Sequence, residues 1–188
     1  MTVYLLLSLQ EVKELFHGYM IVVGMDPSMS NWGLVKADMQ GRILRPIAAD
    51  VIVTKKLSKK KAKHAYKNQE DLERAMLLSK GIAEFIGIDT EHIYVELPVG
   101  SKSSRAMASY GICIGVFSQV RVPFTIIRNT EIKKFVGYGD LDIRKVEKEE
   151  VIKKMIEVGH EKIFTGFKKN VHEHIADAMA ALCVGAQK

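Results

Sequence analysis

Long apolar runs separated by short polar links dominate residues 20–54. Residues 20–25 (MIVVGM) form an unbroken apolar run, which is typical of a strand buried on both faces. Residues 31–38 and 43–54 predict a second and a third strand, and the short links between the three runs indicate antiparallel hairpins. Pro46 has no amide hydrogen to donate, so we expect the third strand to lie at a sheet edge or to carry a bulge.

Helical spacing of apolar residues becomes frequent further along the chain. A helix is predicted over residues 69–87, and its buried side is expected to contain Leu72, Met76, Leu77, Ile82 and Phe85. Further strands are predicted at 92–97 and 123–128, and further helices near 101–119, 129–136, 147–158 and 171–185.

This order of elements predicts an α/β fold. Three meandering strands, followed by strands that alternate with helices, indicate a five-stranded mixed sheet flanked by α-helices, with three antiparallel strands and then parallel ones. We expect residues 20–188 to form a single domain, because no repeat or flexible linker interrupts them. Residues 1–19 form an N-terminal extension, in which helical spacing of apolar residues predicts one amphipathic helix: Leu5, Leu9, Val12 and Phe16.

Composition and charge narrow the range of partners. The chain has 188 residues, a net charge of +6 and 47% apolar residues, which suits one domain and is compatible with a polyanionic partner. Cys113 and Cys183 lie in apolar helical contexts without metal-like spacing, so buried thiols in a reducing compartment are expected. No apolar run reaches the roughly 18 residues of a membrane helix, and a cytoplasmic location without membrane contact is expected.

Acidic residues stand at the ends of unrelated elements. Asp26 closes the first predicted strand and Glu96 closes the fourth, so both carboxylates leave the same sheet edge if these strands are parallel neighbours. His174 and Asp177 are three residues apart near the start of the last helix and therefore share one face. Converging carboxylates repel one another unless a cation neutralises them, and oxygen-rich sites suit Mg²⁺ or Mn²⁺.

Each acidic residue also has a simpler interpretation. Asp26 is compatible with an ordinary turn, Glu96 with an ordinary strand end, and Asp177 with a carboxylate that matches the helix dipole. The combination favours a catalytic site, because three unrelated strand or helix ends carry the same type of group. Two metal ions roughly 3.5–4 Å apart in such a site can support phosphodiester hydrolysis.

Four blocks of the chain, within about residues 20–186, form a pattern that is specific in order and spacing. They are the strand–Asp-Pro–strand opening, a strand–Glu–loop followed by a small-residue helix, a lysine-bearing segment around a Val-Gly-x-Gly turn, and a closing helix: VVGMDPSMSNWGLV, IYVELPVGSKSSRAMASYGICIGV, IIRNTEIKKFVGYGDLDIRKVEKEEVIKKMI and HEHIADAMAAL. Together these blocks resemble the RuvC-type Holliday junction resolvases of the RNase H-like superfamily. Members begin almost at the first strand, so Met20 is an alternative natural start.

The resemblance implies an RNase H-like fold and a crossover junction endonuclease that resolves four-way junctions, with other branched DNA as further substrates. Two Mg²⁺ ions per site, replaceable by Mn²⁺, would be held by Asp26, Glu96, His174 and Asp177, with Glu173 as a rival to His174 for the fourth position.

The resemblance also implies basic residues near the DNA. Lys133 and Lys148 match lysines that support catalysis or hold DNA, although Lys148 is also compatible with an exposed position among glutamates. Further DNA contacts are expected from Lys102, Arg105, Lys134 and the basic run with Lys55, Lys56, Lys59, Lys60, Lys61 and Lys63. This run either contacts phosphates or forms a solvated loop.

The family is homodimeric through its small-residue helix. Ala106, Ala108, Gly111 and Gly115 would allow a partner helix to approach, or would let this helix lie tightly on its own sheet. The chain departs from the family at Ser28, where glycine is usual, and in the loop after Glu96, where members often carry an aromatic residue. A bacteriophage or otherwise divergent member fits these differences.

Two alternatives remain open. One is another RNase H-like nuclease that cuts RNA–DNA hybrids or flaps. The other is a module that binds branched DNA without cutting it. A nucleotide requirement is not expected, because the chain contains no Gly-x-x-x-x-Gly-Lys phosphate loop.

Overall fold

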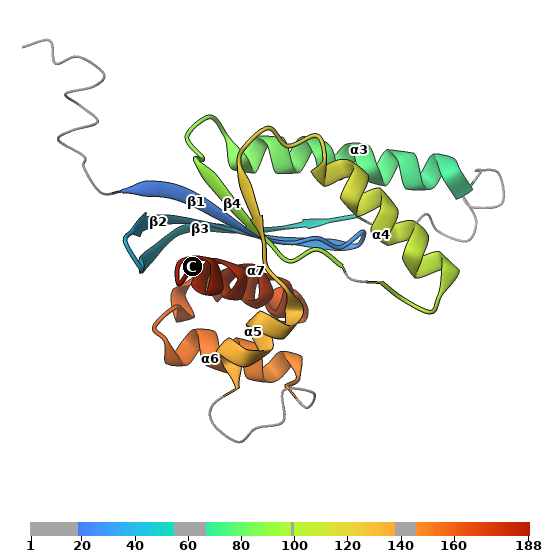
Figure 1. Ribbon diagram of the computed structural model, residues 1–188. Helices are drawn as coiled ribbons and strands as arrows, with labels where there is room; N and C mark the ends of the chain where they lie inside the picture. The colour runs from blue at the N-terminus through green and yellow to red at the C-terminus, as the bar shows by residue number, and fades with distance from the viewer. Residues whose placement is uncertain (1–18, 55–66, 99, 138–145) are drawn as a thin grey trace, which may run out of the picture.

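A five-stranded mixed sheet lies between two layers of helices (Figure 1). The computed structural model describes residues 19–54, 67–98, 100–137 and 146–188. The strands are β1 (Met20–Asp26), β2 (Asn31–Gln40), β3 (Ile43–Val53), β4 (His92–Val95) and β5 (Phe124–Ile126). The predicted N-terminal helix and the basic run at 55–63 lie outside the described residues and stay predictions.

The sheet has the order β3-β2-β1-β4-β5, and its pairing confirms the predicted topology. β1 pairs with β2 and β2 with β3 in antiparallel fashion, whereas β4 runs parallel to both β1 and β5. β3 is an edge strand, and its register with β2 shifts between Lys36 and Ala37, where Pro46 and Ala48 are successive partners. Pro46 therefore lies on an edge strand beside a bulge, as predicted.

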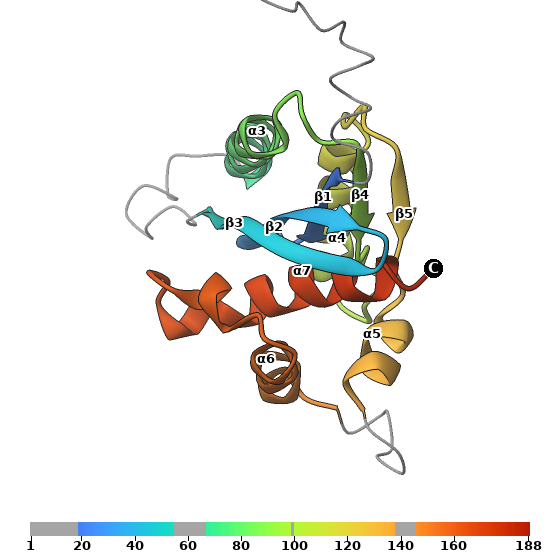
Figure 2. The same cartoon turned by 90° about the vertical axis from the view of Figure 1, so that its left-hand side faces the viewer.

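The helices divide between the two faces of the sheet (Figures 1 and 2). One face is covered by α3 (Lys67–Ile86) and α4 (Ser104–Phe117). The other is covered by α7 (His172–Gly185), on which α5 (Asn129–Val136) and α6 (Lys148–Glu157) pack. Two short 3-10 helices, Glu161–Phe164 and Lys169–Val171, precede α7 and were not predicted.

Side chains of β1 alternate between two cores. Val22 belongs to the core under α7, while Val23 and Met25 belong to the core under α3 and α4. Successive side chains of a strand point to opposite faces, so Asp26, two residues beyond Gly24, points toward α7. This alternation decides which helix can reach the carboxylate.

The predicted buried side of α3 is partly wrong. Leu72, Met76 and Leu77 are 60%, 64% and 57% exposed, whereas Leu78 and Ile82 are buried. Phe85, which was also predicted, packs against the core. The helix is rotated relative to the prediction because its core-facing first turns carry buried polar residues, which an apolar pattern does not count.

Glycines bring α7 into contact with the sheet. A Cβ added to Gly24 would lie 2.1 Å from the Ala178 carbonyl oxygen, and one added to Gly33 would lie 2.0 Å from the His174 carbonyl oxygen. By contrast, a Cβ on Gly111 or Gly115 of α4 would meet nothing within 4 Å. The two α4 glycines therefore do not serve to hold α4 tightly on its own sheet, and that alternative is wrong for them.

Both cysteines are buried as free thiols, as predicted. Burial raises the pKa of Cys113 to about 11 and that of Cys183 to about 12, so neither thiol is poised for reaction. Within the described ranges, none of the helices has the length and apolar character needed to cross a membrane.

Candidate active site

The parallel pairing of β1 and β4 brings Asp26 and Glu96 to one edge of the sheet. Met25 lies opposite Val95, and the Glu96 amide donates to the Met25 carbonyl at 3.1 Å. Glu96 follows two residues after Tyr94, which packs in the core under α7, so its side chain also points toward α7. The expected convergence of these two carboxylates is confirmed.

The first turn of α7 completes this cluster. His174 Nδ1 lies 2.7 Å from Asp26 Oδ2, and both side chains are mostly buried. Gly33 is the β2 residue paired with Asp26, and the absence of a side chain there allows the His174 backbone to rest on the strand. The sequence motif pointed to His174, but it gave no role to Gly33.

Asp177 shares the cleft with Asp26 and Glu96. Its pKa is raised to about 8, first by burial and then by the charges of Asp26 and Glu96. Burial also raises the pKa of Glu96, and Asp26 adds to that rise. The Asp26 carboxylate therefore disfavours the charged forms of both Glu96 and Asp177, which is the electrostatic condition that a bound cation relieves.

A chain of polar contacts connects α6 to this cluster. Lys148 Nζ lies 2.6 Å from Glu173 Oε2, and Glu173 Oε1 lies 3.3 Å from His174 Nε2. The Glu173 carboxylate raises the pKa of Lys148, with smaller contributions from Asp177 and Asp26. Lys148 thus belongs to the site electrostatically, and Glu173 occupies the space between Lys148 and His174.

Asn129 is a site residue that the sequence interpretation missed. Its side-chain amide donates to Glu96 Oε1 at 2.7 Å, and this hydrogen bond lowers the pKa of Glu96 against the effect of burial. Asn129 begins α5 just after β5, which runs parallel to β4. The rule that located Asp26 and Glu96, the shared edge of parallel strands, also points to this position.

The acidic cluster lines an open cleft of about 420 Å³. Asp26, Glu96, Lys148, His174 and Asp177 all line it. Residues 27–30 after β1 and Ala106, Ser109 and Tyr110 of α4 also line it. The cleft is therefore bounded by the predicted site residues and by two further segments, to which the sequence assigned no part in the site.

The remaining predicted basic residues have different surroundings. Lys133 is close enough to lower the pKa of Glu96, whereas Lys102 and Lys134 are exposed. Arg105 forms a two-point ion pair with Asp71, with both nitrogen–oxygen distances at 2.6 Å. Its guanidinium is therefore already engaged within the protein.

Divalent cations fit the donor chemistry of this cluster. Across residues 19–54, 67–98, 100–137 and 146–188, no three His, Cys, Asp or Glu side chains already form a metal-ligand group. Asp26, Glu96 and Asp177 nevertheless offer carboxylate oxygens at one cleft, with His174 beside them, and hard cations such as Mg²⁺ prefer such oxygens.

Comparison with solved structures defines the class of fold, which is the RNase H-like fold seen in junction-resolving nucleases. More particularly, the chain has the fold of RuvC. Thermus thermophilus RuvC in complex with Holliday junction substrate superposes with a TM-score of 0.62 at 19% identity, over 89% of this chain and 93% of that chain.

A second structure of Thermus thermophilus RuvC gives a TM-score of 0.60 at 21% identity, with the same coverage of both chains. Fowlpox virus resolvase in complex with its Holliday junction DNA gives 0.52 at 15% identity, over 89% of this chain and 97% of that chain. No protein-family model and no curated protein sequence matches the chain. These likenesses establish the fold, and the predicted mixed sheet of the RuvC type is confirmed.

Proposed function

We propose that the protein is a divalent-metal-dependent DNA endonuclease that resolves four-way junctions by paired nicks. The observation that carries the proposal is the convergence of Asp26, Glu96 and Asp177, with His174, in one open cleft. The fold adds support, since two of the superposed proteins were solved with Holliday junction DNA.

Asp26, Glu96, Asp177 and His174 are the residues that would hold the metal ions. Bound Mg²⁺ or Mn²⁺ would supply activation of a water nucleophile and stabilisation of the leaving oxygen, the chemistry of two-metal phosphodiester hydrolysis. The products would be a 5′-phosphate and a 3′-hydroxyl.

The side chains around the ligands have distinct tasks in this proposal. Asn129 orients Glu96 through the hydrogen bond to its Oε1 atom. Lys148 lines the cleft, so its ammonium group can offset the charge of a phosphate there. His174 Nδ1 lies within hydrogen-bonding distance of Asp26 Oδ2, and this contact holds the imidazole within the cleft.

Two cleavage sites related by two-fold symmetry would explain paired nicks in a symmetric junction. We propose α4 as the dimer contact, because Met107 and Ile114 are exposed apolar residues on this helix and Gly111 and Gly115 face open space. Lys102, Lys134 and the lysines of 55–63 would contact the phosphates of the bound arms.

The decisive assay is cleavage of a synthetic four-way junction and of an RNA–DNA hybrid, each with Mg²⁺, with Mn²⁺ and with EDTA. Symmetric paired nicks on the junction in either metal are expected, and Asp26→Asn, Glu96→Gln and Asp177→Asn should each abolish them while junction binding persists. Glu84→Gln, an exposed acid on α3, is the matched control.

Other outcomes assign other functions. Preferential cutting of the RNA strand would identify a hybrid nuclease instead. Junction binding without cleavage in either metal, together with no effect of Asp26→Asn, would identify a binding module.

A further inference from the structure

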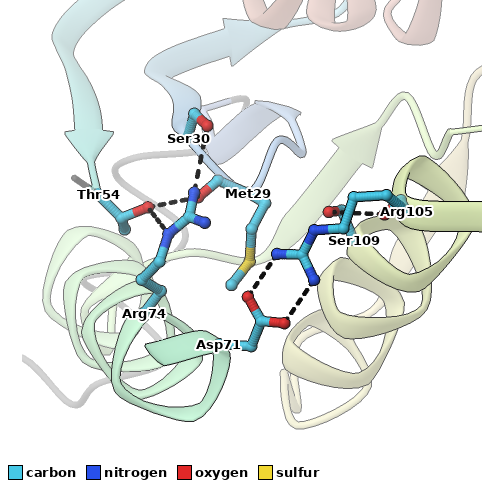
Figure 3. Close-up of polar contacts among 7 residues, drawn as sticks. All are labelled: Met29, Ser30, Thr54, Asp71, Arg74, Arg105 and Ser109. Atoms are coloured by element: carbon cyan, nitrogen blue, oxygen red, sulfur yellow. Dashed lines mark hydrogen bonds and ion pairs between the residues drawn. The ribbon is translucent and has the colours of Figure 1, made fainter. Parts of the chain in front are cut away.

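The core-facing side of α3 carries three buried charged residues, Glu70, Asp71 and Arg74, and the last two contact partners beside the cleft. Asp71 and Arg74 are only 8% and 3% exposed, and they are three residues apart, so they lie on one face of the helix. Figure 3 shows that the two side chains reach in different directions, Arg74 toward Met29, Ser30 and Thr54, and Asp71 toward Arg105. Charged side chains are seldom buried without a specific partner, so each contact needs a reason.

Arg74 holds the link between β1 and β2. Its Nη2 group donates to the Met29 carbonyl at 2.7 Å and to Ser30 Oγ at 3.2 Å, and its Nε group donates to Thr54 Oγ1 at 2.9 Å. The Thr54 hydroxyl donates to the same Met29 carbonyl, and the Thr54 amide donates to the Ser30 carbonyl at 2.9 Å. The link is thus fixed at its backbone only three residues after Asp26.

Asp71 holds the start of α4. Its two carboxylate oxygens accept from Nη1 and Nη2 of Arg105, each at 2.6 Å, in the two-point geometry that fixes both distance and orientation. Arg105 is the second residue of α4, and Ala106, Ser109 and Tyr110 follow it along the cleft. The carboxylate also raises the pKa of Arg105, which keeps the guanidinium charged.

Arg74 and Asp71 each contact a different segment that lines the cleft. Residues 27–30 form one wall and the first turns of α4 form another, and neither wall belongs to the sheet that carries Asp26 and Glu96. We infer that Asp71 and Arg74 are positioning residues, and that α3 acts through them as a bracket that sets the separation of these walls. This inference rests on the proposed nuclease function of the cleft.

In this inference Arg105 positions α4 through its ion pair with Asp71, which differs from the predicted contact with DNA. A phosphate-binding arginine would contribute to affinity and to its salt dependence. A bracket arginine would instead contribute to the rate of the bound complex, because displacement of a cleft wall by about 1 Å can lower catalysis on the order of 10²-fold. The two roles are therefore separable by experiment.

The test is a double-variant cycle with Asp71→Asn, Arg105→Gln and the combined variant. Junction binding is measured in Ca²⁺ at several salt concentrations, and single-turnover cleavage is measured in Mg²⁺. We expect each single variant to cleave 10-fold to 100-fold more slowly, and the combined variant to be no slower than either. Glu73→Gln and Arg121→Gln, exposed residues of matching charge, should behave like wild type in both measurements.

The opposite pattern would overturn the bracket. If Arg105 contacts DNA directly, Arg105→Gln will weaken binding and lower the salt slope by about one, while Asp71→Asn will strengthen binding. Additive losses of cleavage rate in the combined variant would also contradict a shared contact.

Arg74 is tested by Arg74→Lys and Arg74→Gln, because lysine keeps the charge but lacks the planar fork. Both variants should cleave slowly with unchanged junction affinity, and hydrogen exchange should rise over residues 27–30 but not over α5 to α7. Wild-type exchange at 27–30 would refute the role of Arg74 even if the protein cleaved no junction. Conversely, a wild-type protein without cleavage would refute the proposed function and leave the exchange result to decide the bracket.

Discussion

Replacing Gly33 with alanine tests how the sheet positions His174. Gly33 pairs with Asp26 across the β1–β2 ladder, and an added Cβ would lie 2.0 Å from the His174 carbonyl oxygen and 2.5 Å from its carbonyl carbon. Ordinary contacts begin at 3.4 Å, so the start of α7 has to move away by roughly 1.4 Å. Because both neighbours are backbone atoms, no side-chain rotation can relieve this overlap.

This displacement has two measurable consequences. The contact between His174 Nδ1 and Asp26 Oδ2, now 2.7 Å, would stretch beyond hydrogen-bonding distance. We expect junction cleavage to slow by about 10²-fold, the scale for an ångström of misplacement, while overpacking costs about 1–3 kcal/mol of unfolding free energy. A loss of that size lowers the melting temperature of a chain of this length by about 2–4 °C per kcal/mol.

Gly185→Ala is the matched control for Gly33→Ala. Its added Cβ would lie 2.1 Å from a ring carbon of Tyr94, so it overpacks the same helix against the same sheet. However, Gly185 is eleven residues from His174, about 16 Å along the helix. Gly185→Ala should therefore lower the melting temperature without slowing the bound complex. Equal losses of cleavage rate in both variants, or wild-type cleavage by Gly33→Ala, would refute the proposed role of Gly33.

Three further predictions concern pH, Glu173 and the basic run. The pKa of Asp177 is raised to about 8 from 3.8, which favours the protonated carboxyl in the folded protein. In EDTA the free energy of unfolding should therefore fall as the pH rises toward 8, and Asp177→Asn should fall less. Melting temperatures of wild type and variant that change equally between pH 6 and pH 9 would contradict this. Glu173→Gln should slow cleavage without changing the half-saturating Mg²⁺ concentration, because Glu173 holds Lys148 and His174; a 10-fold rise in that concentration would identify it as a metal ligand. Replacing Lys59, Lys60 and Lys61 by glutamine should lower the salt slope of junction binding by about 0.9 per phosphate contact, and an unchanged slope would indicate a solvated loop.

The position of Asp26 and Glu96 at one edge of the sheet was predictable from the sequence, because it follows from strand direction alone. Once β1 and β4 were assigned as parallel neighbours, Asp26 and Glu96 had to leave at the same edge. Alternation along each strand then selects the α7 face, where Asp177 lies. These relations are local and periodic, so a single sequence is enough to find them.

Close approach between distant elements was not predictable in the same way. Gly33 and His174 touch across about 140 positions of chain, and a glycine in a strand gives no indication of which backbone approaches it. The same holds for Asn129, whose partner Glu96 lies on another element. Such contacts depend on the three-dimensional separation of elements, which apolar spacing does not specify.

The error on α3 has a physical explanation that also bears on function. The prediction selected Leu72 and Met76 as buried because apolar spacing treats charged residues as surface residues. Asp71 and Arg74 instead face inward, and each is held there by partners close to the cleft. A charged residue at a core-facing position costs stability unless its partners are fixed, so a fold gains from it only where that fixed geometry has a use. Asp71 and Arg74, which the apolar pattern treated as surface residues, are therefore the residues that connect α3 to the elements lining the cleft.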